Sequence, residues 1–137
     1  MARADLVKEV GGFNDDYFYA SEESELCLKI TDLGYLLAVL PSCAVWHKIS
    51  QTMKTGSEII VYYVYRNRLL FIRNNSTKFG LRETLAILQL YIFSFLSYLL
   101  KQRNLPAVRG LVRGVIDFRR GIKGVGRYKP VLQADRT

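Results

Sequence analysis

The pattern of apolar and polar positions predicts a chain of helices interrupted by two short strands. Apolar residues that recur every three or four positions predict helices over residues 5–10, 22–33, 57–74, 81–102 and 106–121. Two short apolar runs beside turn residues predict strands over residues 35–40 and 44–47. The expected fold class is therefore α/β, with short strands followed by three mainly amphipathic or apolar helices.

The second expected helix has the clearest boundaries. Leu26, Ile30 and Leu33 share one face at helical spacing. Ser21 precedes them as a candidate N-cap, and Gly34 follows as the natural stop. We therefore expect this helix to bury one apolar stripe and to end sharply.

The two C-terminal helices differ in character. Residues 84–100 carry no charge and would form about 26 Å of helix, slightly less than the roughly 30 Å hydrocarbon core of a bilayer. They fit a marginal membrane span, an interfacial helix or a helix packed against another part of the protein. The helix over 106–121 sets an apolar face against arginines, a pattern typical of binding to anionic lipid. We expect residues 76–122 to associate with an anionic membrane surface, mostly peripherally.

Charge is unevenly distributed along the chain, whose formal net charge is +8. Residues 1–34 hold three bases and eight acids, whereas residues 48–137 hold seventeen bases and four acids. A cationic C-terminal part favours phosphate groups, of lipids or of nucleic acid. The sequence has no motif of the common nucleic-acid-binding folds, so we expect no nucleic-acid partner.

Length and cysteine content narrow the class of protein further. The 137 residues amount to one domain at most, and half of them are apolar, which favours a packed core. Cys27 and Cys43 lie in apolar segments without metal-ligand spacing, so we expect reduced core thiols in a cytosolic protein. The N-terminus shows no signal-peptide pattern.

An acidic cluster follows an aromatic loop, which covers residues 13–20, and is the main candidate for catalytic chemistry. Glu22, Glu23 and Glu25 fall at the start of the second expected helix, where the helix dipole favours negative charge. That placement alone would explain them as stabilisers of the helix start. The alternative is a general base, because a carboxylate held at a pocket edge could take a proton from an acceptor hydroxyl. Tyr17 and Phe18 could then stack on sugar rings.

Three further residues are candidates for binding phosphate or metal. His47 ends an apolar run, and a neutral imidazole suits either a divalent metal or a phosphate. Arg66 and Asn67 lie on the helix expected over 57–74, where an arginine fork would suit a diphosphate. The alternatives are a structural histidine and a solvated basic stripe.

Five segments, which together cover roughly residues 4–73, follow one another in a recognisable order and spacing. The segments are VKEVGGFNDDYF at 7–18, EESELCLK at 22–29, LGY at 33–35 followed by LP at 40–41, AVWHK at 44–48, and YYVYRNRLLF at 62–71. They resemble the motifs of family 2 glycosyltransferases, and particularly those of rhamnosyltransferase-like enzymes of bacterial cell-surface polysaccharide assembly.

This resemblance implies a GT-A fold, which binds a nucleotide-diphospho-sugar, and a divalent metal, Mn²⁺ or Mg²⁺, in the complete enzyme. Carried over by position, Glu23 matches the catalytic base, although the family usually has Asp there. Glu22 and Glu25 match the flanking acids that contact the acceptor. His47 matches the histidine that approaches the metal and the diphosphate.

The resemblance also implies that this chain is only the C-terminal part of such a domain. The sequence has no DxD metal motif, and its first residues match a segment well inside the family's catalytic domain. We expect an acceptor-side part over 1–75, membrane-associating helices over 76–122 and a flexible basic tail over 123–137. The expected function is sugar transfer from a nucleotide-diphospho-sugar to a saccharide or lipid-linked acceptor at the cytoplasmic face of the cell membrane. We expect the chain alone to bind no metal and to be inactive. The alternative is a non-enzymatic membrane-associated module.

Overall fold

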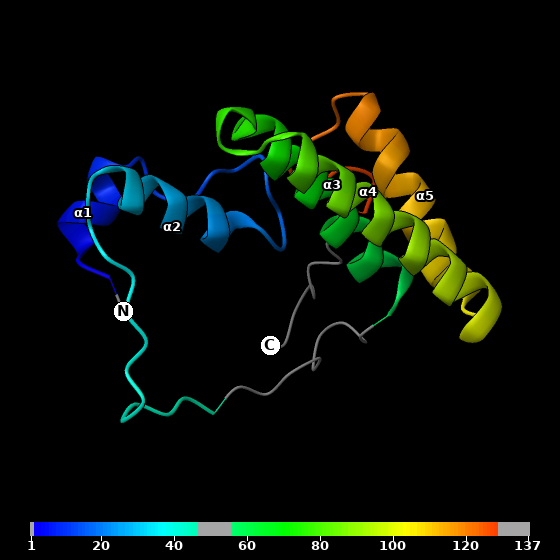
Figure 1. Ribbon diagram of the computed structural model, residues 1–137, viewed down its shortest axis with the longest axis horizontal. Helices are drawn as coiled ribbons and strands as arrows, with labels where there is room; N and C mark the ends of the chain where they lie inside the picture. The colour runs from blue at the N-terminus through cyan, green and yellow to red at the C-terminus, as the bar shows by residue number, and fades with distance from the viewer. Residues whose placement is uncertain (1, 47–55, 129–137) are drawn as a thin grey trace, which may run out of the picture.

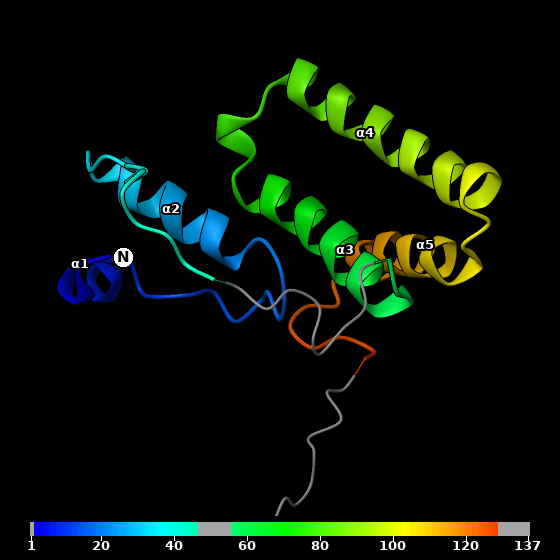
Figure 2. The same cartoon turned by 90° about the horizontal axis from the view of Figure 1, so that it is seen from below.

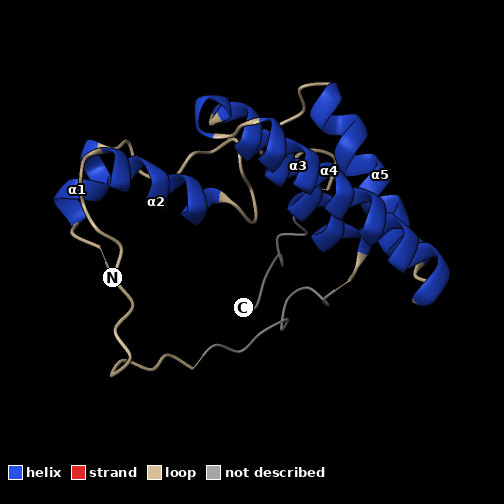
Figure 3. Cartoon of the chain, in the orientation of Figure 1, coloured by secondary structure: helices blue, strands red, loops and turns tan. Residues whose placement is uncertain are grey.

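The computed structural model describes residues 2–46 and 56–128 of the chain. Within those residues the regular structure is entirely helical (Figure 3). The elements are α1 (Ala4–Glu9), α2 (Glu22–Asp32), α3 (Glu58–Asn74), a 3₁₀ turn at Ser76–Lys78, α4 (Leu81–Leu96), a π-helical turn at Ser97–Lys101 and α5 (Leu105–Arg119). All five predicted helices are therefore present.

The helices form two groups, each with its own apolar core (Figure 1). In the first, Leu6 of α1 packs on Leu26 and Ile30 of α2. In the second, α3 packs on α5, and α4 runs back along α3 (Figure 2). The buried residues of this second core are Val61, Tyr65, Tyr91, Ala107 and Leu111.

A close helix crossing joins α3 to α5. Gly110 of α5 faces the first turn of α3 so closely that a Cβ there would lie 2.3 Å from the Glu58 carbonyl oxygen. Glu58 also pairs with Arg109 and Arg113 of α5, with an Arg109 Nε–Glu58 Oε2 distance of 3.6 Å. Buried positions recur along α5 at helical spacing, namely Ala107, Gly110, Leu111, Gly114 and Asp117. Of the apolar face that the sequence assigns to lipid, Leu111 is buried in the second core and Val115 packs against it, whereas Leu105 and Val112 are exposed.

The two predicted strands are absent from the described residues. Residues 35–46 form an extended loop, and its apolar side chains lie in solvent, with Leu36 93% and Val39 91% exposed. A strand requires a hydrogen-bonded neighbour. No other described segment runs alongside this loop as a strand, so the strand expected over 35–40 is wrong for this structure. The same holds for residues 44–46, whereas His47 lies outside the described residues.

Two local expectations are also wrong. Ser21 precedes α2 but its side chain makes no capping hydrogen bond, because its backbone adopts the left-handed conformation at φ 78°. Cys43 is exposed and Cys27 is half-buried, so neither is a fully buried core thiol. Gly34 does follow α2 at φ 86°, as its proposed role as a stop requires.

The segment after α5 folds back on the protein, contrary to the expectation of a flexible tail from residue 123. The Gly124 amide donates to the Asp16 carbonyl at 2.7 Å, and the Tyr63 hydroxyl lies within hydrogen-bond distance of the Val125 and Tyr128 carbonyls, at 2.7 and 2.8 Å, and can donate to either. These contacts place residues 122–128 against the aromatic loop and α3 at once. Residues 129–137 of the predicted tail lie outside the described part of the chain.

The α3–α5 crossing yields a stability prediction. Gly110→Ala would force the new methyl group into the α3 backbone, so we expect a loss of about 1–3 kcal/mol in the free energy of unfolding. Val112→Ala, at an exposed site on the same helix, is the control and should change stability by less than about 0.5 kcal/mol. Urea unfolding followed by circular dichroism measures both; equal midpoints for the two variants would refute the close crossing.

Candidate functional site

The candidate site is built around the start of α2, where the backbone is strained. Ala20 and Ser21 adopt φ values of 65° and 78°, a left-handed conformation that is unfavourable for residues with a Cβ. Two such residues in succession turn the chain sharply into α2, so that Glu22 and Glu23 occupy its first turn. Strain of this kind persists only where surrounding contacts impose it.

Asn67 supplies those contacts from α3. Its Nδ2 donates to the Tyr19 carbonyl at 2.6 Å and to the Ala20 carbonyl at 3.2 Å, and the side chain is fully buried. Its Oδ1 in turn accepts from Arg66 Nε at 2.9 Å. Asn67 therefore fixes the peptide that precedes the left-handed turn and the peptide between its two residues.

Arg66 is also fully buried and holds a second segment in place. Its Nη2 donates to the Gly124 carbonyl at 2.5 Å, and its Nη1 donates to the Tyr62 hydroxyl at 3.1 Å. The guanidinium carbon also lies 5.1 Å from the centre of the Tyr62 ring. Gly126 packs so closely here that a Cβ would approach Arg66 Nη1 to 2.4 Å.

The polar chain continues from Tyr62 to the end of α5. The Tyr62 hydroxyl donates to Asp117 Oδ2 at 2.8 Å, and Arg127 Nε donates to the same oxygen at 2.8 Å. The hydrogen bond from Arg127 lowers the pKa of Asp117, and the bond from Tyr62 lowers it further, against the opposing effect of burial. The buried positive charge of Arg66 is thus linked to a buried carboxylate through one tyrosine hydroxyl.

Arg66 and Asn67 are therefore both fully buried, without contact with solvent in this structure. Their direct contact with a diphosphate stays a prediction, and what the structure shows is a positioning role. Sequence spacing could have indicated the Tyr62–Arg66 pair, since residues four apart share a helix face. Nothing in the sequence singles out Asp117 or Arg127 as its partners.

A second buried polar cluster joins α2 to the end of α3. Glu25 accepts from the Tyr17 hydroxyl and from Asn14 Nδ2, the latter at 2.8 Å, while Asn74 Nδ2 donates to the Tyr17 hydroxyl at 3.2 Å. Burial alone would raise the pKa of Glu25, but these hydrogen bonds and nearby Lys29 lower it below its ordinary value.

Glu25 and Tyr17 are each 5% exposed, so both sit inside the protein. Their role as acceptor ligands stays a prediction, and their observed role is to clamp α2 onto α3. Phe18, the next residue, is 41% exposed and packs its ring 5.1 Å from that of Tyr63. Of the predicted aromatic pair, only Phe18 presents a ring to solvent. Asn14 and Asn74 were not predicted.

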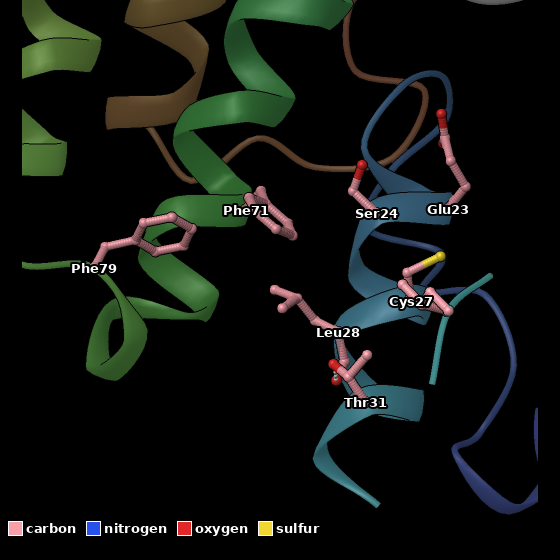
Figure 4. Close-up of a pocket in the computed structure, with 8 residues that line it drawn as sticks. Glu23, Ser24, Cys27, Leu28, Thr31, Phe71 and Phe79 are labelled. Atoms are coloured by element: carbon pink, nitrogen blue, oxygen red, sulfur yellow. Dashed lines mark hydrogen bonds between the residues drawn. The ribbon is translucent and has the colours of Figure 1, made fainter. Parts of the chain in front are cut away.

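Glu23 is exposed at the rim of an open groove of about 430 Å³ (Figure 4). Phe71 of α3 and Phe79, which follows α3 in the chain, face Leu28 of α2. The centres of the two phenylalanine rings lie 5.8 Å apart. The Glu23 carboxylate projects from the first turn of α2. The lining residues are Glu23, Ser24, Cys27, Leu28, Thr31, Leu37, Phe71 and Phe79.

Glu22, adjacent to Glu23, is half-buried. Its Oε2 is enclosed and finds no hydrogen-bond partner among the described residues. Burial raises the pKa of Glu22, and the neighbouring charge of Glu23 raises it further. The two predicted acids thus differ: the pKa of Glu22 is raised by burial, whereas Glu23 is exposed to solvent.

The described residues assemble no group of three His, Cys, Asp or Glu side chains that could hold a metal ion. His47 lies outside them, so its predicted binding of metal and diphosphate stays a prediction. The described acids do not by themselves fit a divalent metal, because Glu25 is fully engaged by protein donors.

The chain is 24% identical over 136 aligned residues to a protein described as dTDP-rhamnosyl transferase RfbF from Shigella flexneri. The match covers 93% of this chain and 46% of that protein, so the chain spans about half the length of this relative. The similarity supports a glycosyltransferase-like relationship. No protein-family model matches the sequence. No solved structure matches it either.

The role of Asn67 can be tested by hydrogen exchange. Asn67→Ala leaves the Tyr19 and Ala20 carbonyls without their donor, so we expect the first turn of α2 to open more readily. The amide of Glu25, which donates to the Ser21 carbonyl at 3.0 Å, should exchange about tenfold faster or more. Asn75→Ala, which removes only a bond to Phe71 within the same helix, is the matched control. Unchanged exchange at Glu25 in Asn67→Ala would contradict the positioning role.

Acid should destabilise the fold through Glu25. Because its pKa is lower in the folded state, its contribution is present above the ordinary value of 4.5 and is lost as pH falls through the folded-state value. Asp117 acts with the same sign. We expect Glu25→Gln to flatten the fall of unfolding free energy with decreasing pH, with a residual slope from Asp117. Glu9→Gln, at an exposed site on α1, is the control and should leave the slope unchanged. Unfolding midpoints measured from neutral pH to below pH 4.5 provide the test.

Proposed function

We propose that this chain is the acceptor-side part of a family 2-like glycosyltransferase of the GT-A class. It would transfer a sugar from a nucleotide-diphospho-sugar to a saccharide or lipid-linked acceptor of the cell surface. The observation that carries the proposal is the exposed Glu23 carboxylate, held at the rim of an open groove by a strained turn. The similarity to the Shigella flexneri transferase supports it.

Glu23 is assigned as the general base. Its carboxylate accepts the proton of the acceptor hydroxyl as that oxygen forms a bond to the anomeric carbon of the donor sugar. The bond from that carbon to the diphosphate oxygen breaks, and the nucleoside diphosphate leaves with the electron pair. A base in this role contributes about 10²- to 10⁴-fold to the rate.

The surroundings of Glu23 suit an acceptor with both polar and apolar surface. Leu28, Phe71 and Phe79 form an apolar wall, while Ser24 and Thr31 add hydroxyl groups. Aromatic rings pack on the apolar faces of sugar rings, and the same wall would accommodate part of a lipid carrier. Glu22, whose pKa is raised by burial, lies beside the proposed base.

The donor is assigned to another part of the enzyme. The sequence lacks a DxD motif, and the chain spans about half of its relative. A divalent metal, when bound in the complete enzyme, would neutralise charge on the leaving diphosphate. Mn²⁺ or Mg²⁺ is the expected ion, with His47 as the candidate ligand from this chain. The chain alone is expected to show no turnover.

A chimeric enzyme tests the assignment. The segment of the Shigella flexneri transferase that matches this chain is replaced by this sequence, and transfer from dTDP-rhamnose to that enzyme's own acceptor is measured. Glu23→Gln should lower kcat by about 10²- to 10⁴-fold, because the amide cannot accept the proton. Glu23→Asp retains a carboxylate and should keep measurable turnover.

The matched control is Glu9→Gln on α1, which should leave kcat unchanged. A chimera that turns over equally well with Gln at position 23 would refute the assignment of Glu23 as the base. Turnover by this chain alone would refute the division between donor and acceptor parts.

A further inference from the structure

We propose that α4 docks lengthwise on an anionic lipid surface, with its uncovered apolar face toward the lipid. This inference does not rest on the proposed catalytic role of Glu23. It also differs from the sequence-based expectation, which assigned the lipid contact to the apolar face of α5 as well.

The continuous helix formed by α4 and the π-helical turn after it is apolar on all sides, but the protein covers only one side. An 18-residue window of the helix Leu81–Lys101 has a mean hydropathy of 1.5, and by length and composition this helix could cross a membrane. A helix that is apolar all round is normally buried on all sides. Large apolar side chains nevertheless face solvent along its length, namely Leu81, Leu85, Leu88, Leu90, Ile92, Phe93, Leu96, Leu99 and Leu100.

The opposite face of α4 is committed to the protein. Tyr91 is buried, its hydroxyl donates to the Tyr65 carbonyl at 2.5 Å, and the two rings lie 4.8 Å apart. Ile87 and Phe95 pack on the same core from α4. Ile87, Tyr91 and Phe95 thus face the protein, whereas a set of residues dominated by leucine faces solvent.

This attachment favours an orientation along the surface over a span. To cross a bilayer, α4 would carry its partner α3 into the hydrocarbon or separate from it. The Arg68 guanidinium lies 5.9 Å from the centre of the Tyr65 ring that packs on Tyr91, and a charge at that depth would cost at least about 2–3 kcal/mol. Separation would expose the Tyr91 contact instead. Lying flat, the helix buries its uncovered apolar face and leaves α3 in water.

The charges at the ends of α4 identify the partner as anionic. Arg82 stands at its start, and Lys101 and Arg103 stand just beyond its end, all exposed. Between Glu83 and Asp117 the sequence contains no acid. The Glu83 carboxylate is turned to the Gly80 amide, from which it accepts a hydrogen bond at 2.9 Å.

The same charges disfavour a second copy of the chain as the occupant. Two copies paired antiparallel through α4 would bring Arg82 toward the partner's Lys101, and parallel pairing would bring each cation toward its own counterpart. Either arrangement opposes like charges at both ends. An anionic lipid surface matches the cations and the apolar face together.

Tryptophan fluorescence provides a direct test. The single tryptophan, Trp46, is exposed and can be replaced by phenylalanine, after which a new tryptophan is placed on α4 as Phe93→Trp, where the parent side chain is 71% exposed. The matched control is Leu36→Trp in the exposed loop, in the same background. The chain is synthesised in the presence of vesicles made either of phosphatidylcholine alone or of equal parts phosphatidylcholine and phosphatidylglycerol.

We expect quenching by brominated lipid and a blue shift for Phe93→Trp on the anionic vesicles, and neither for Leu36→Trp. In flotation, Phe93→Glu should leave the chain unbound, whereas Leu36→Glu should float as the parent does. Arg82→Gln and Lys101→Gln should each weaken binding about fivefold. Equal helicity by circular dichroism confirms that these exposed substitutions leave the fold intact.

Three results would overturn the proposal. They are equal binding to neutral and anionic vesicles, equal quenching at positions 36 and 93, and flotation of Phe93→Glu like the parent. A dimer or a complex with another protein that protects position 93 from aqueous quencher, with no vesicle binding, would assign the face to that partner and refute lipid docking.

Discussion

A buried arginine–asparagine pair on α3 is the constraint on which the rest of this structure depends. Arg66 and Asn67 are both fully inaccessible to solvent, and a guanidinium removed from water is tolerated only when its donors are satisfied. The donors find carbonyls at Tyr19 and Ala20 and at Gly124, in two segments far apart in sequence. The aromatic loop and the segment after α5 are therefore held against the same turn of α3.

This constraint reaches the candidate site through the backbone. The peptides that Asn67 holds lie at the start of a left-handed turn, and Glu22 and Glu23 follow that turn in the first turn of α2. The Glu25 cluster then fixes α2 against the end of α3. One carboxylate is thereby left exposed at the groove while the acids beside it are partly or wholly enclosed, and this difference in environment gives the proposed base its separate role.

The apolar surface left uncovered has two parts of different character. The loop over 35–46 exposes apolar side chains without regular structure, as expected of backbone that lacks a neighbouring strand. The outer face of α4 is a regular helix surface whose backbone is already satisfied. Such a face needs only an apolar environment, which a lipid surface provides, whereas the loop needs hydrogen-bonding partners as well.

The helices, their approximate ends and the position of the acidic cluster at a helix start could be predicted from the amino-acid sequence, because apolar spacing and stop residues such as Gly34 are local signals. Periodicity also indicated that α5 has one apolar face. What each face contacts became apparent in the folded chain: α5 packs on α3 through Gly110, while the outer face of α4 is uncovered. The tertiary structure likewise decided that Arg66 and Asn67 point inward and that residues 122–128 pack, since the hydrogen bonds responsible join residues up to 65 positions apart. Contacts over such separations leave no local pattern in the sequence.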